Sequence, residues 1–391
     1  MALDRRPSIN PNQRIRLRRL LPLFLFLATI VALQFFVLFS KNGYSLRKAL
    51  PGLSTPRPGP LHVLVVSYAR SGSSFLGDLL AELPDAFYYF ELLHFLGSSV
   101  LNGTDINHRA RHLLSVAFQC NISVVDGFMD WQKRHQTFMK LKRSIHYWAT
   151  CSNATRAKNA INNVCYNATY MDSYCSKKDI LIAKTIRIKL PEVIDLFYNP
   201  SLNLKVIYLM RDPRGSFNSR NKFPIAAWCK KDVLCHSAKQ FCTSLEDDLE
   251  AVCHLRAEKP TDFLAIRYED LAMNPYQTTK TIVRFLGFEE IPKNLVSFLK
   301  THTSVQDKLK IRTKAMGIEF PYSTFRNSAM AATSWRKEMS FVRLTELQKS
   351  CQPVLNFFGY HSYSTLVSLR SNIQYDIGIE NALLQHCVQN L

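Results

Sequence analysis

HVLVVSYARSGSSFLGDLLAEL, residues 62–83, contains the pattern that decides the fold. Residues 62–68 are an apolar, β-branched run typical of a buried strand, and residues 74–83 carry apolar side chains at helical spacing. A short loop of small residues stands between them, and its Gly72 permits a positive φ. The stretch therefore predicts a strand, a tight loop and a helix, which is the beginning of an α/β fold.

The predicted loop is a candidate anion site, because its backbone N–H groups and the positive end of the helix dipole point at one spot. Ser71, Ser73 and Ser74 add hydroxyl donors, and Arg70 adds a fixed charge that fits phosphate or sulfate oxygens. Taken alone, the loop fits an ordinary serine-capped β–α turn equally well. It is not a Walker loop, since no Lys-Ser/Thr pair ends it, and this counts against ATP or GTP hydrolysis.

A second loop of this kind follows a second apolar run. Residues 204–210 predict a strand and lead into RDPRGSFNSR, residues 211–220. Pro213 suits the first turn of a helix, and Arg211 and Ser219 are placed to meet a second anionic group. This stretch alone also fits a capped helix with a solvated basic face. Together, the two loops predict a ligand with phosphates at two ends, bound at the carboxyl edge of a parallel sheet.

Other runs complete the predicted architecture. Strands are expected at residues 180–188 and 263–268, and helices at 276–286 and 344–358. Strands that alternate with helices indicate a central parallel sheet flanked by helices, a P-loop-like α/β domain. Residues 102–176 are polar, which predicts a surface region of helices and loops inserted between core elements.

The N-terminal part of the chain predicts a membrane anchor. Residues 20–39 carry no charge and are long enough to cross about 30 Å of hydrocarbon. Arginines cluster before this run, which favours a cytosolic N-terminus, and no small-residue cleavage site supports the alternative of a signal peptide. We expect a cytoplasmic tail at 1–19, a single transmembrane signal anchor at 20–39, a stem at 40–60 and a lumenal domain at 61–391.

Sequons and cysteines also favour a lumenal body. N-glycosylation sequons begin at Asn102, Asn121, Asn153 and Asn167. The chain has 10 Cys, all after the predicted anchor, which fits disulfides in an oxidising compartment. Zinc is the alternative for the cysteines between 229 and 253, but they lack the close spacing of structural zinc sites. The spacing does not reveal which cysteines pair.

The composition limits the classes of protein and of binding partner that fit this chain. Hydrophobic residues make up 47% of the chain, which excludes a fully disordered protein. The formal net charge of +20 implies an anionic partner, which can be nucleic acid, acidic lipid, acidic polysaccharide or a phosphate-bearing cofactor.

The pair RSGSSF and RDPRGSFNSR resembles the 5′- and 3′-phosphate-binding motifs of Golgi carbohydrate 6-O-sulfotransferases, which modify galactose, N-acetylglucosamine or N-acetylgalactosamine. Further stretches agree in the same order: FYYFE at 87–91, AKTIRI at 183–188, RYEDLAMNP at 267–275 and RNSAMAATSWR at 326–336. The likeness runs from about residue 61 to residue 360. It implies 3′-phosphoadenylyl sulfate as the sulfuryl donor, no metal, no nucleic acid partner, and a glycan or proteoglycan acceptor at a Golgi membrane.

The resemblance also implies roles for particular residues. The residues expected to hold the 5′-phosphosulfate are Arg70, Ser71, Gly72, Ser73, Ser74, Phe75 and Leu76. Those expected to bind the 3′-phosphate are Arg211, Asp212, Pro213, Arg214, Gly215, Ser216, Phe217, Asn218 and Ser219, with Arg211 and Ser219 foremost.

Glu91 matches the family's general base, and Arg70 would stabilise the charge on the leaving group. Leu92 stands where the family has proline, which bears on the placement of the base. The alternatives are that Glu91 is a surface carboxylate at a strand end and that His94 is the base.

Other polar residues in the matching stretches have open roles. Lys184 and Arg187 are expected either to face the sulfate or an acidic acceptor, or to be outward residues of an alternating strand. Four residues either close over the nucleotide or form a basic helix start with the tryptophan in the core: Arg326, Ser328, Trp335 and Arg336.

Two other classes of protein remain compatible with the residues. One is a P-loop transferase that uses a nucleoside triphosphate, which the missing Lys-Ser/Thr pair disfavours. The other is a catalytically silent glycan-binding membrane protein, for which the departure at Leu92 is the only support.

Overall fold

The computed structural model describes residues 59–135, 141–155, 160–222, 229, 232–303, 324, 327–371 and 379–388. The predicted tail, the predicted anchor at 20–39 and almost all of the predicted stem lie outside these residues. Among the residues that are described, no helix combines the length and apolar character needed to cross a bilayer.

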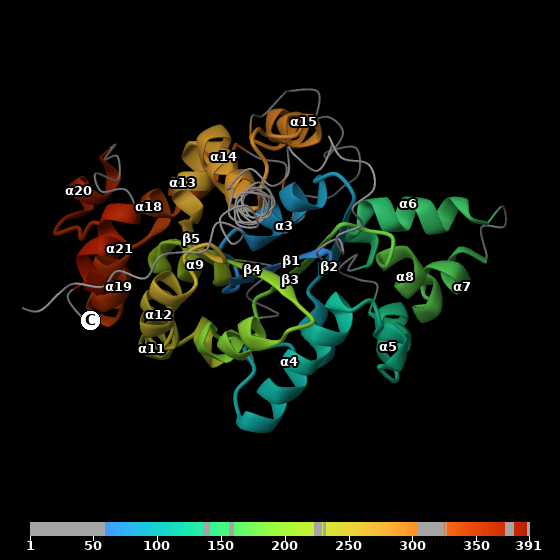
Figure 1. Cartoon of the computed structure of the whole chain (residues 1–391). Helices are drawn as coiled ribbons and strands as arrows, with labels where there is room; N and C mark the ends of the chain where they lie inside the picture. The colour runs from blue at the N-terminus through green and yellow to red at the C-terminus, as the bar shows by residue number, and fades with distance from the viewer. Residues whose placement is uncertain are drawn as a thin grey trace, which may run out of the picture. The chain divides into compact units, whose positions relative to one another are not determined.

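A parallel sheet forms the centre of the described chain (Figure 1). Its strands are β1 (Leu61–Ser67), β2 (Ala86–Phe90), β3 (Ile180–Thr185), β4 (Asn203–Met210) and β5 (Phe263–Arg267). They lie in the order β2-β3-β1-β4-β5, and every pairing is parallel. Since β1 and β4 are neighbours, the loops that leave their carboxyl ends meet at one edge of the sheet.

Helices connect the strands and cover both faces. Between β1 and β3 lie α3 (Ser73–Ala81), η1 (Leu92–Phe95), α4 (Thr104–Phe118), η2 (Ile122–Val124), α5 (Phe128–Arg134), η4 (Leu141–Arg143), α6 (Ile145–Asn153), α7 (Ile161–Cys165) and α8 (Ala168–Cys175). Between β3 and β5 lie η6 (Pro191–Tyr198), α9 (Pro213–Arg220), η7 (Val233–Cys235), α11 (Ala238–Glu246) and α12 (Leu249–Glu258). After β5 come α13 (Tyr268–Met273), α14 (Pro275–Phe285), α15 (Lys293–His302), α17 (Ser328–Thr333), α18 (Trp335–Glu338), α19 (Phe341–Phe357), α20 (Leu366–Arg370) and α21 (Ile379–Val388).

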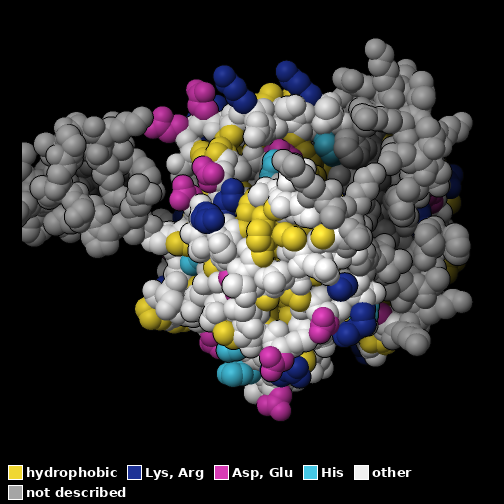
Figure 2. Space-filling model, turned by 90° about the vertical axis from the view of Figure 1, so that its right-hand side faces the viewer, with side chains coloured by type: hydrophobic (Ala, Val, Ile, Leu, Met, Phe, Trp, Pro, Cys, Tyr) yellow, Lys and Arg dark blue, Asp and Glu magenta, His cyan; other side chains and the backbone are white. Residues whose placement is uncertain are grey.

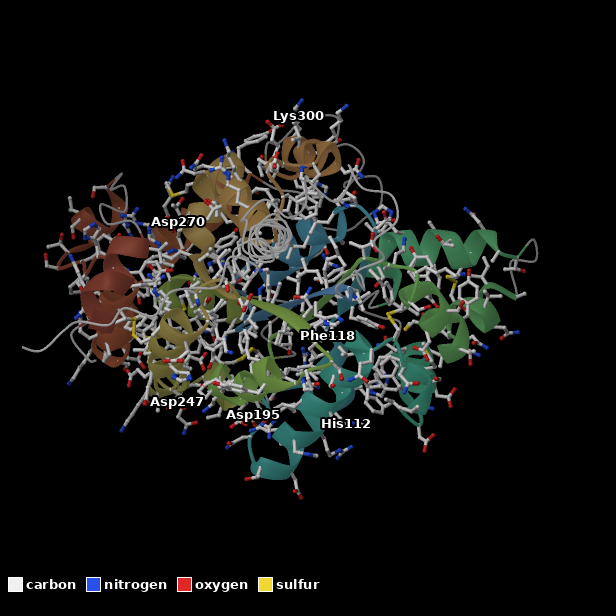
Figure 3. The ribbon with its side chains drawn as sticks, viewed as in Figure 1. His112, Phe118, Asp195, Asp247, Asp270 and Lys300 are labelled. Atoms are coloured by element: carbon white, nitrogen blue, oxygen red, sulfur yellow. A yellow bond between two sulfur atoms is a disulfide. The ribbon has the colours of Figure 1, made fainter. Side chains whose placement is uncertain are left out.

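The sheet separates two apolar cores, because successive strand residues point to opposite faces. Val63 and Val65 of β1 pack with apolar residues of α3, α13, α14 and α15. Leu64 and Val66 pack into the larger core, which includes residues of α4, α8, α11 and α19. Figure 3 shows Phe118 at the end of α4 close to the strands, and its ring lies 5.0 Å from the ring of His62 on β1.

The predicted strands and helices are confirmed, with ends that differ by a few residues. The largest differences are at β3, which ends at Thr185 although the apolar run continues to residue 188, and at α19, which begins at Phe341, three residues before the predicted start. Residues 102–176 do form an insertion of helices between β2 and β3, as predicted. The insertion is not only a surface region, however, since Leu113 and Leu114 of α4 are buried in the larger core.

Disulfides pair all of the cysteines, so the prediction of disulfides is confirmed and the zinc alternative is wrong. The bonded pairs are Cys120 with Cys175, Cys151 with Cys165, Cys229 with Cys235, Cys242 with Cys351, and Cys253 with Cys387. The last two pairs join α11 to α19 and α12 to α21, which fixes the C-terminal helices on the larger core.

Candidate functional site

The loop after β1 has the backbone of an anion-binding turn. Gly72 precedes α3 with φ 86°, and Arg70 also has a positive φ, 69°, which is uncommon for a residue with a side chain. A Cβ atom on Gly72 would lie 2.2 Å from the ring of Tyr268, so only glycine fits at this turn. The N-terminus of α3, whose first residues are serines, faces the carboxyl edge of the sheet.

The loop after β4 is fixed by a buried acidic residue at its helix. The side chain of Asp212 accepts a hydrogen bond from the Arg214 N–H and so caps α9. The same carboxylate forms a two-point ion pair with the Arg214 guanidinium. The Asp212 N–H in turn donates to Glu269 of α13 at 3.1 Å. These contacts set the direction in which α9 leaves the sheet.

Side chains of the two loops contact one another, as the strand order requires. The Arg70 Nε donates to the Ser219 Oγ at 3.0 Å, and the Ser71 and Ser216 hydroxyls lie 3.3 Å apart. Arg211 donates to the Arg70 carbonyl at 2.8 Å. The structure therefore brings together Arg70, Ser71, Arg211 and Ser219, which the sequence had placed in two separate motifs.

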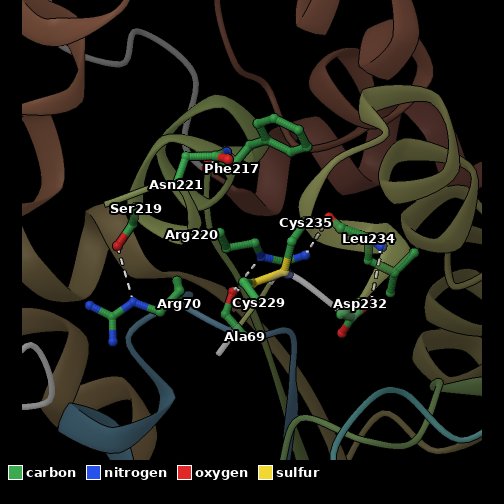
Figure 4. Close-up of a disulfide and its surroundings, with 10 residues drawn as sticks. All are labelled: Ala69, Arg70, Phe217, Ser219, Arg220, Asn221, Cys229, Asp232, Leu234 and Cys235. Atoms are coloured by element: carbon green, nitrogen blue, oxygen red, sulfur yellow. Dashed lines mark hydrogen bonds between the residues drawn. A yellow bond between two sulfur atoms is a disulfide. The ribbon is translucent and has the colours of Figure 1, made fainter. Parts of the chain in front are cut away.

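Arg220 supports the contact between the two loops by binding backbone carbonyls (Figure 4). Its guanidinium donates to the Ala69 carbonyl and, at 3.0 Å, to the Leu234 carbonyl of the segment that the Cys229–Cys235 disulfide closes. Burial lowers the pKa of Arg220 to about 10, so the side chain remains charged at neutral pH. This role of Arg220 was not predictable from sequence patterns, because its partners are backbone carbonyls distant along the chain.

Exposure divides the predicted donor-binding residues into two groups. Those that are partly exposed are Arg70, Gly72, Ser74, Asn218 and Ser219. Those that are buried are Ser71, Ser73, Phe75, Leu76, Arg211, Asp212, Pro213, Arg214, Gly215, Ser216 and Phe217. Arg214 is 0% exposed, and its other guanidinium partners are the Gln348 side chain and the His361 carbonyl, so its contacts lie inside the protein.

Arg211 lies at the centre of the junction. Besides the Arg70 carbonyl, it donates to the Ala331 carbonyl at 2.9 Å, and its guanidinium lies 4.8 Å from the centre of the Tyr268 ring. Its Nε is buried and has no hydrogen-bond partner among the residues that the structure describes. A buried donor of this kind is expected to meet an acceptor, and a phosphate oxygen is one.

Glu91 lies at the carboxyl end of β2 in a strained backbone conformation, with φ 54°. Its N–H donates to the Lys184 carbonyl at 3.1 Å, which continues the ladder between β2 and β3. The carboxylate forms ion pairs with both Lys184 and Arg187. All three side chains are buried, so the alternatives of a surface carboxylate and of outward-facing cations are wrong. The ring of His94, the rival base, packs against the Trp131 ring in an edge-to-face arrangement, with the ring centres 5.4 Å apart.

The C-terminal stretch of the resemblance packs inside the protein. Trp335 is 1% exposed and lies so close to Gly215 that an added Cβ there would be 2.9 Å from its ring. Ser328 donates to the Ala272 carbonyl, and Arg336 donates to the Leu369 carbonyl. These contacts favour the alternative that places the tryptophan in the core. Arg326 lies outside the described residues.

The face in Figure 2 carries no single basic patch, and the described residues provide no metal site. On the face in Figure 2, Lys and Arg side chains stand among Asp and Glu side chains instead of forming one basic patch. Within the described ranges, no group of three His, Cys, Asp or Glu side chains is placed to hold a metal ion. The positive charge of the site comes instead from the arginines and from the helix N-terminus.

Two buried carboxyl groups near the site have raised pKa values. Burial, with a smaller effect from the Asp212 charge, raises the pKa of Glu269 to about 7. Burial likewise raises the pKa of Asp248 to about 7, although Tyr208 and the Leu190 N–H donate to it. Glu269 supports the loop after β4 through the Asp212 N–H, and Asp248 accepts from Tyr208 on β4.

We expect Glu269 to contribute stability at pH 5 that is lost at pH 8. A carboxyl group whose pKa is raised on folding stabilises the protein below its ordinary pKa, and this stabilisation is lost as the pH rises through about 7. Replacing Glu269 with Gln keeps an acceptor for the Asp212 N–H but removes the titration. Urea unfolding with disulfides intact should give the free energy of unfolding of both proteins at pH 5 and pH 8. From pH 5 to pH 8 this free energy should change less favourably in the native protein than in E269Q, by up to about 3 kcal/mol. An equal change in both proteins would contradict this account.

Comparison with known proteins gives one family. A sulfotransferase domain family model matches residues 60–359. Carbohydrate sulfotransferase 1 of Danio rerio is 29% identical over 346 residues, which cover 79% of this chain and 80% of that protein. Carbohydrate sulfotransferase 4 of Mus musculus is 27% identical over 77% of this chain and 82% of that protein, and carbohydrate sulfotransferase 5 of Homo sapiens is 27% identical over 79% and 80%.

The solved structures that resemble this chain have lower sequence identity to it than these relatives have. A sulfotransferase domain from the curacin biosynthetic pathway is 19% identical, covers 78% of this chain and 99% of its own, and has a TM-score of 0.44. A likeness this weak carries no argument about the site.

Proposed function

This chain belongs to the sulfotransferase domain family, and on that premise we propose that it transfers a sulfuryl group from 3′-phosphoadenylyl sulfate to the 6-hydroxyl of a sugar. The motifs of this sequence resemble those of carbohydrate sulfotransferases. The relatives that align with about four fifths of this chain are carbohydrate sulfotransferases too. The observation that supports the donor best is the junction of the two loops. There, Arg70, Ser219 and Arg211 meet at one edge of the sheet.

The residues present at this junction fit a donor with phosphates at two ends. The turn at Gly72 starts α3 without a side-chain cap, and the helix N-terminus favours an anion at this edge of the sheet. The buried Nε of Arg211 is a donor in need of an acceptor. We assign the direct contacts to Arg70, Ser74 and Ser219, which are partly exposed, and to Arg211. Asp212 and Arg214 instead hold the second loop in shape.

The donor, when bound, supplies an activated sulfur whose bond to the 5′-phosphate oxygen is broken. The acceptor hydroxyl oxygen forms the new bond to sulfur, and the nucleotide 3′,5′-bisphosphate leaves. The Arg70 guanidinium and the N–H groups of α3 stabilise the negative charge on the leaving oxygen, at a few kcal/mol for each good donor. The Glu91 carboxylate takes the proton of the acceptor hydroxyl and passes it to solvent.

The acceptor is a galactose, N-acetylglucosamine or N-acetylgalactosamine residue, in glycans such as keratan sulfate, chondroitin sulfate or glycoproteins. The names of the relatives, which are carbohydrate sulfotransferases, support a carbohydrate acceptor. The excess of positive charge favours an acceptor chain that already carries sulfate or carboxylate groups.

We place the enzyme in the Golgi membrane as a single-pass protein with a cytosolic N-terminus and a lumenal catalytic domain. Support comes from the apolar run at residues 20–39 and from the disulfides. All four sequon asparagines are exposed, which an accepted glycan requires: Asn102, Asn121, Asn153 and Asn167.

We expect N-linked glycans on this region. Protein made in secretory cells should run faster on a gel after digestion with an N-glycosidase, because the sequons are accessible from solvent. A variant with the four asparagines replaced by Gln is the control and should not shift. If the native protein also fails to shift, the lumenal placement is contradicted.

A binding experiment separates this proposal from a transferase that uses a nucleoside triphosphate. Titration calorimetry should detect binding of adenosine 3′,5′-bisphosphate and little binding of ATP with magnesium. The reason is that the loop lacks the Lys-Ser/Thr pair but offers arginines at both phosphate positions. Tighter binding of ATP would favour the other class.

A further inference from the structure

The carboxylate of Glu91 is held by a buried cation on each oxygen. Lys184 pairs with Oε1 and Arg187 with Oε2. The exposed fractions are 5% for Glu91, 2% for Lys184 and 3% for Arg187, so little water competes for these contacts. A carboxylate fixed through both oxygens does not turn about its last bond, and its remaining lone pairs keep one direction.

Arg187 is itself fixed to two parts of the chain. Its side-chain Nε donates to the Gly97 carbonyl at 2.9 Å, and its backbone N–H donates to the Thr185 Oγ1 at 3.1 Å. Its carbonyl accepts from the Leu101 N–H at 2.8 Å. The backbone and the guanidinium of Arg187 together connect the end of β3 to the segment after η1, and the guanidinium pairs with Glu91.

Lys184 has a different support. Its Nζ lies 4.8 Å from the centre of the Phe90 ring, next to Glu91 in sequence. Arg143, which pairs with Asp78, also lies over this ring, 4.7 Å from its centre. The ion pairs of the carboxylate in the described part of the chain are those with Lys184 and Arg187, while Arg143 pairs with Asp78 and the His94 ring packs against Trp131.

Two cations around one carboxylate leave the cluster with an excess of positive charge. Each cation favours the ionised carboxylate, because a nearby opposite charge stabilises the charged form. These pairings do not follow from the strand pattern, which puts Lys184 and Arg187 three residues apart without showing what they face.

We propose that Arg187 and Lys184 are positioning residues that hold the Glu91 carboxylate ionised and aimed at the acceptor hydroxyl. This rests on the sulfuryl transfer proposed above. The proton moves from the hydroxyl oxygen to a Glu91 oxygen as the new sulfur–oxygen bond forms, and then to solvent. The two cations carry no proton in the reaction, and their effect is exerted through Glu91.

The test compares pH–rate profiles of the full-length protein with those of Arg187→Met and Lys184→Met. In each variant the acidic limb of kcat should move upward by about one pH unit or more, because one stabilising charge has been removed. The value of kcat at the plateau should fall by up to about 10²-fold through loss of orientation. Binding of adenosine 3′,5′-bisphosphate should stay within about threefold, since Glu91 is not among the donor contacts.

Arg187→Lys is the conservative variant, and Arg111→Met is the matched control. Lysine at 187 keeps the charge but not the fork, so the acidic limb should return close to its wild-type position while kcat is only partly restored. Arg111 pairs with Glu192 on another part of the fold, and its replacement should move neither quantity.

The outcomes separate this inference from the proposed function. If the wild-type protein transfers no sulfuryl group to any glycan, the proposed function fails. If the wild-type protein is active and the acidic limb stays in place in both methionine variants, the positioning role is overturned, whatever the loss in kcat. If one methionine variant does not fold, the other decides, because the two cations are predicted to act in the same direction.

Discussion

Replacing Glu91 with Gln lowers turnover by about 10²–10⁴-fold and leaves donor affinity near its wild-type value. Glutamine keeps the size of the side chain but does not accept the hydroxyl proton at neutral pH. We assign the phosphates to Arg70, Ser219 and Arg211, which follow strands β1 and β4 and not β2, so binding of the donor is not expected to depend on this carboxylate. The measurement is the rate of sulfuryl transfer at saturating donor, together with calorimetry of the nucleotide bisphosphate.

The structure sharpens this expectation, because the substitution leaves Lys184 and Arg187 with a neutral partner. Some loss of stability is expected, so thermal unfolding of E91Q must show a folded protein at the assay temperature. Near-normal turnover of folded E91Q would remove Glu91 as the base and turn attention to His94. Loss of donor binding would mean that Glu91 instead shapes the phosphate loop.

Replacing Arg211 with Ala weakens binding of adenosine 3′,5′-bisphosphate by about 10- to 100-fold. A charge-assisted hydrogen bond contributes about 1.5–3 kcal/mol, and about 1.4 kcal/mol corresponds to a factor of ten. Arg70→Ala should weaken binding by a similar factor at the other loop. The loss for Arg211→Ala should be the larger, because Arg211 also supports the Arg70 and Ala331 carbonyls.

Calorimetry on folded protein checks both variants. Arg111→Ala, which removes an arginine from an ion pair on α4, is the control and should bind the bisphosphate normally. Wild-type affinity in Arg70→Ala or in Arg211→Ala would contradict the assignment of that arginine to the donor site.

Local patterns allowed most of the sheet to be predicted from the sequence. The strands β1, β4 and β5 are apolar runs, and a run that is buried on both faces of a parallel sheet looks the same wherever it occurs. β2 was not predicted as a strand, because AFYYF is short and its tyrosines have no alternating pattern. Tyr88 and Tyr89 are nevertheless buried, one in each core.

The site could be predicted only in part. The two loops were recognisable because glycine, serine and arginine at a strand end point to anion binding whatever the partner strands are. The partners of Glu91 and Arg220 were not, because they depend on which strands are neighbours and which carbonyls the chain leaves unpaired. Arg214 was predicted from the motif to bind donor, yet in the structure it is an internal support for Asp212.

The most direct test of the central claim is transfer of labelled sulfate from 3′-phosphoadenylyl sulfate to a panel of glycans by the purified protein, with and without the Glu91→Gln substitution. The panel should contain terminal and internal galactose, N-acetylglucosamine and N-acetylgalactosamine, with and without existing sulfate. Label should appear on the 6-hydroxyl of at least one sugar with the wild-type protein and fall by at least about 10²-fold with E91Q. A folded wild-type protein that binds the donor but labels no glycan in the panel would contradict the claim.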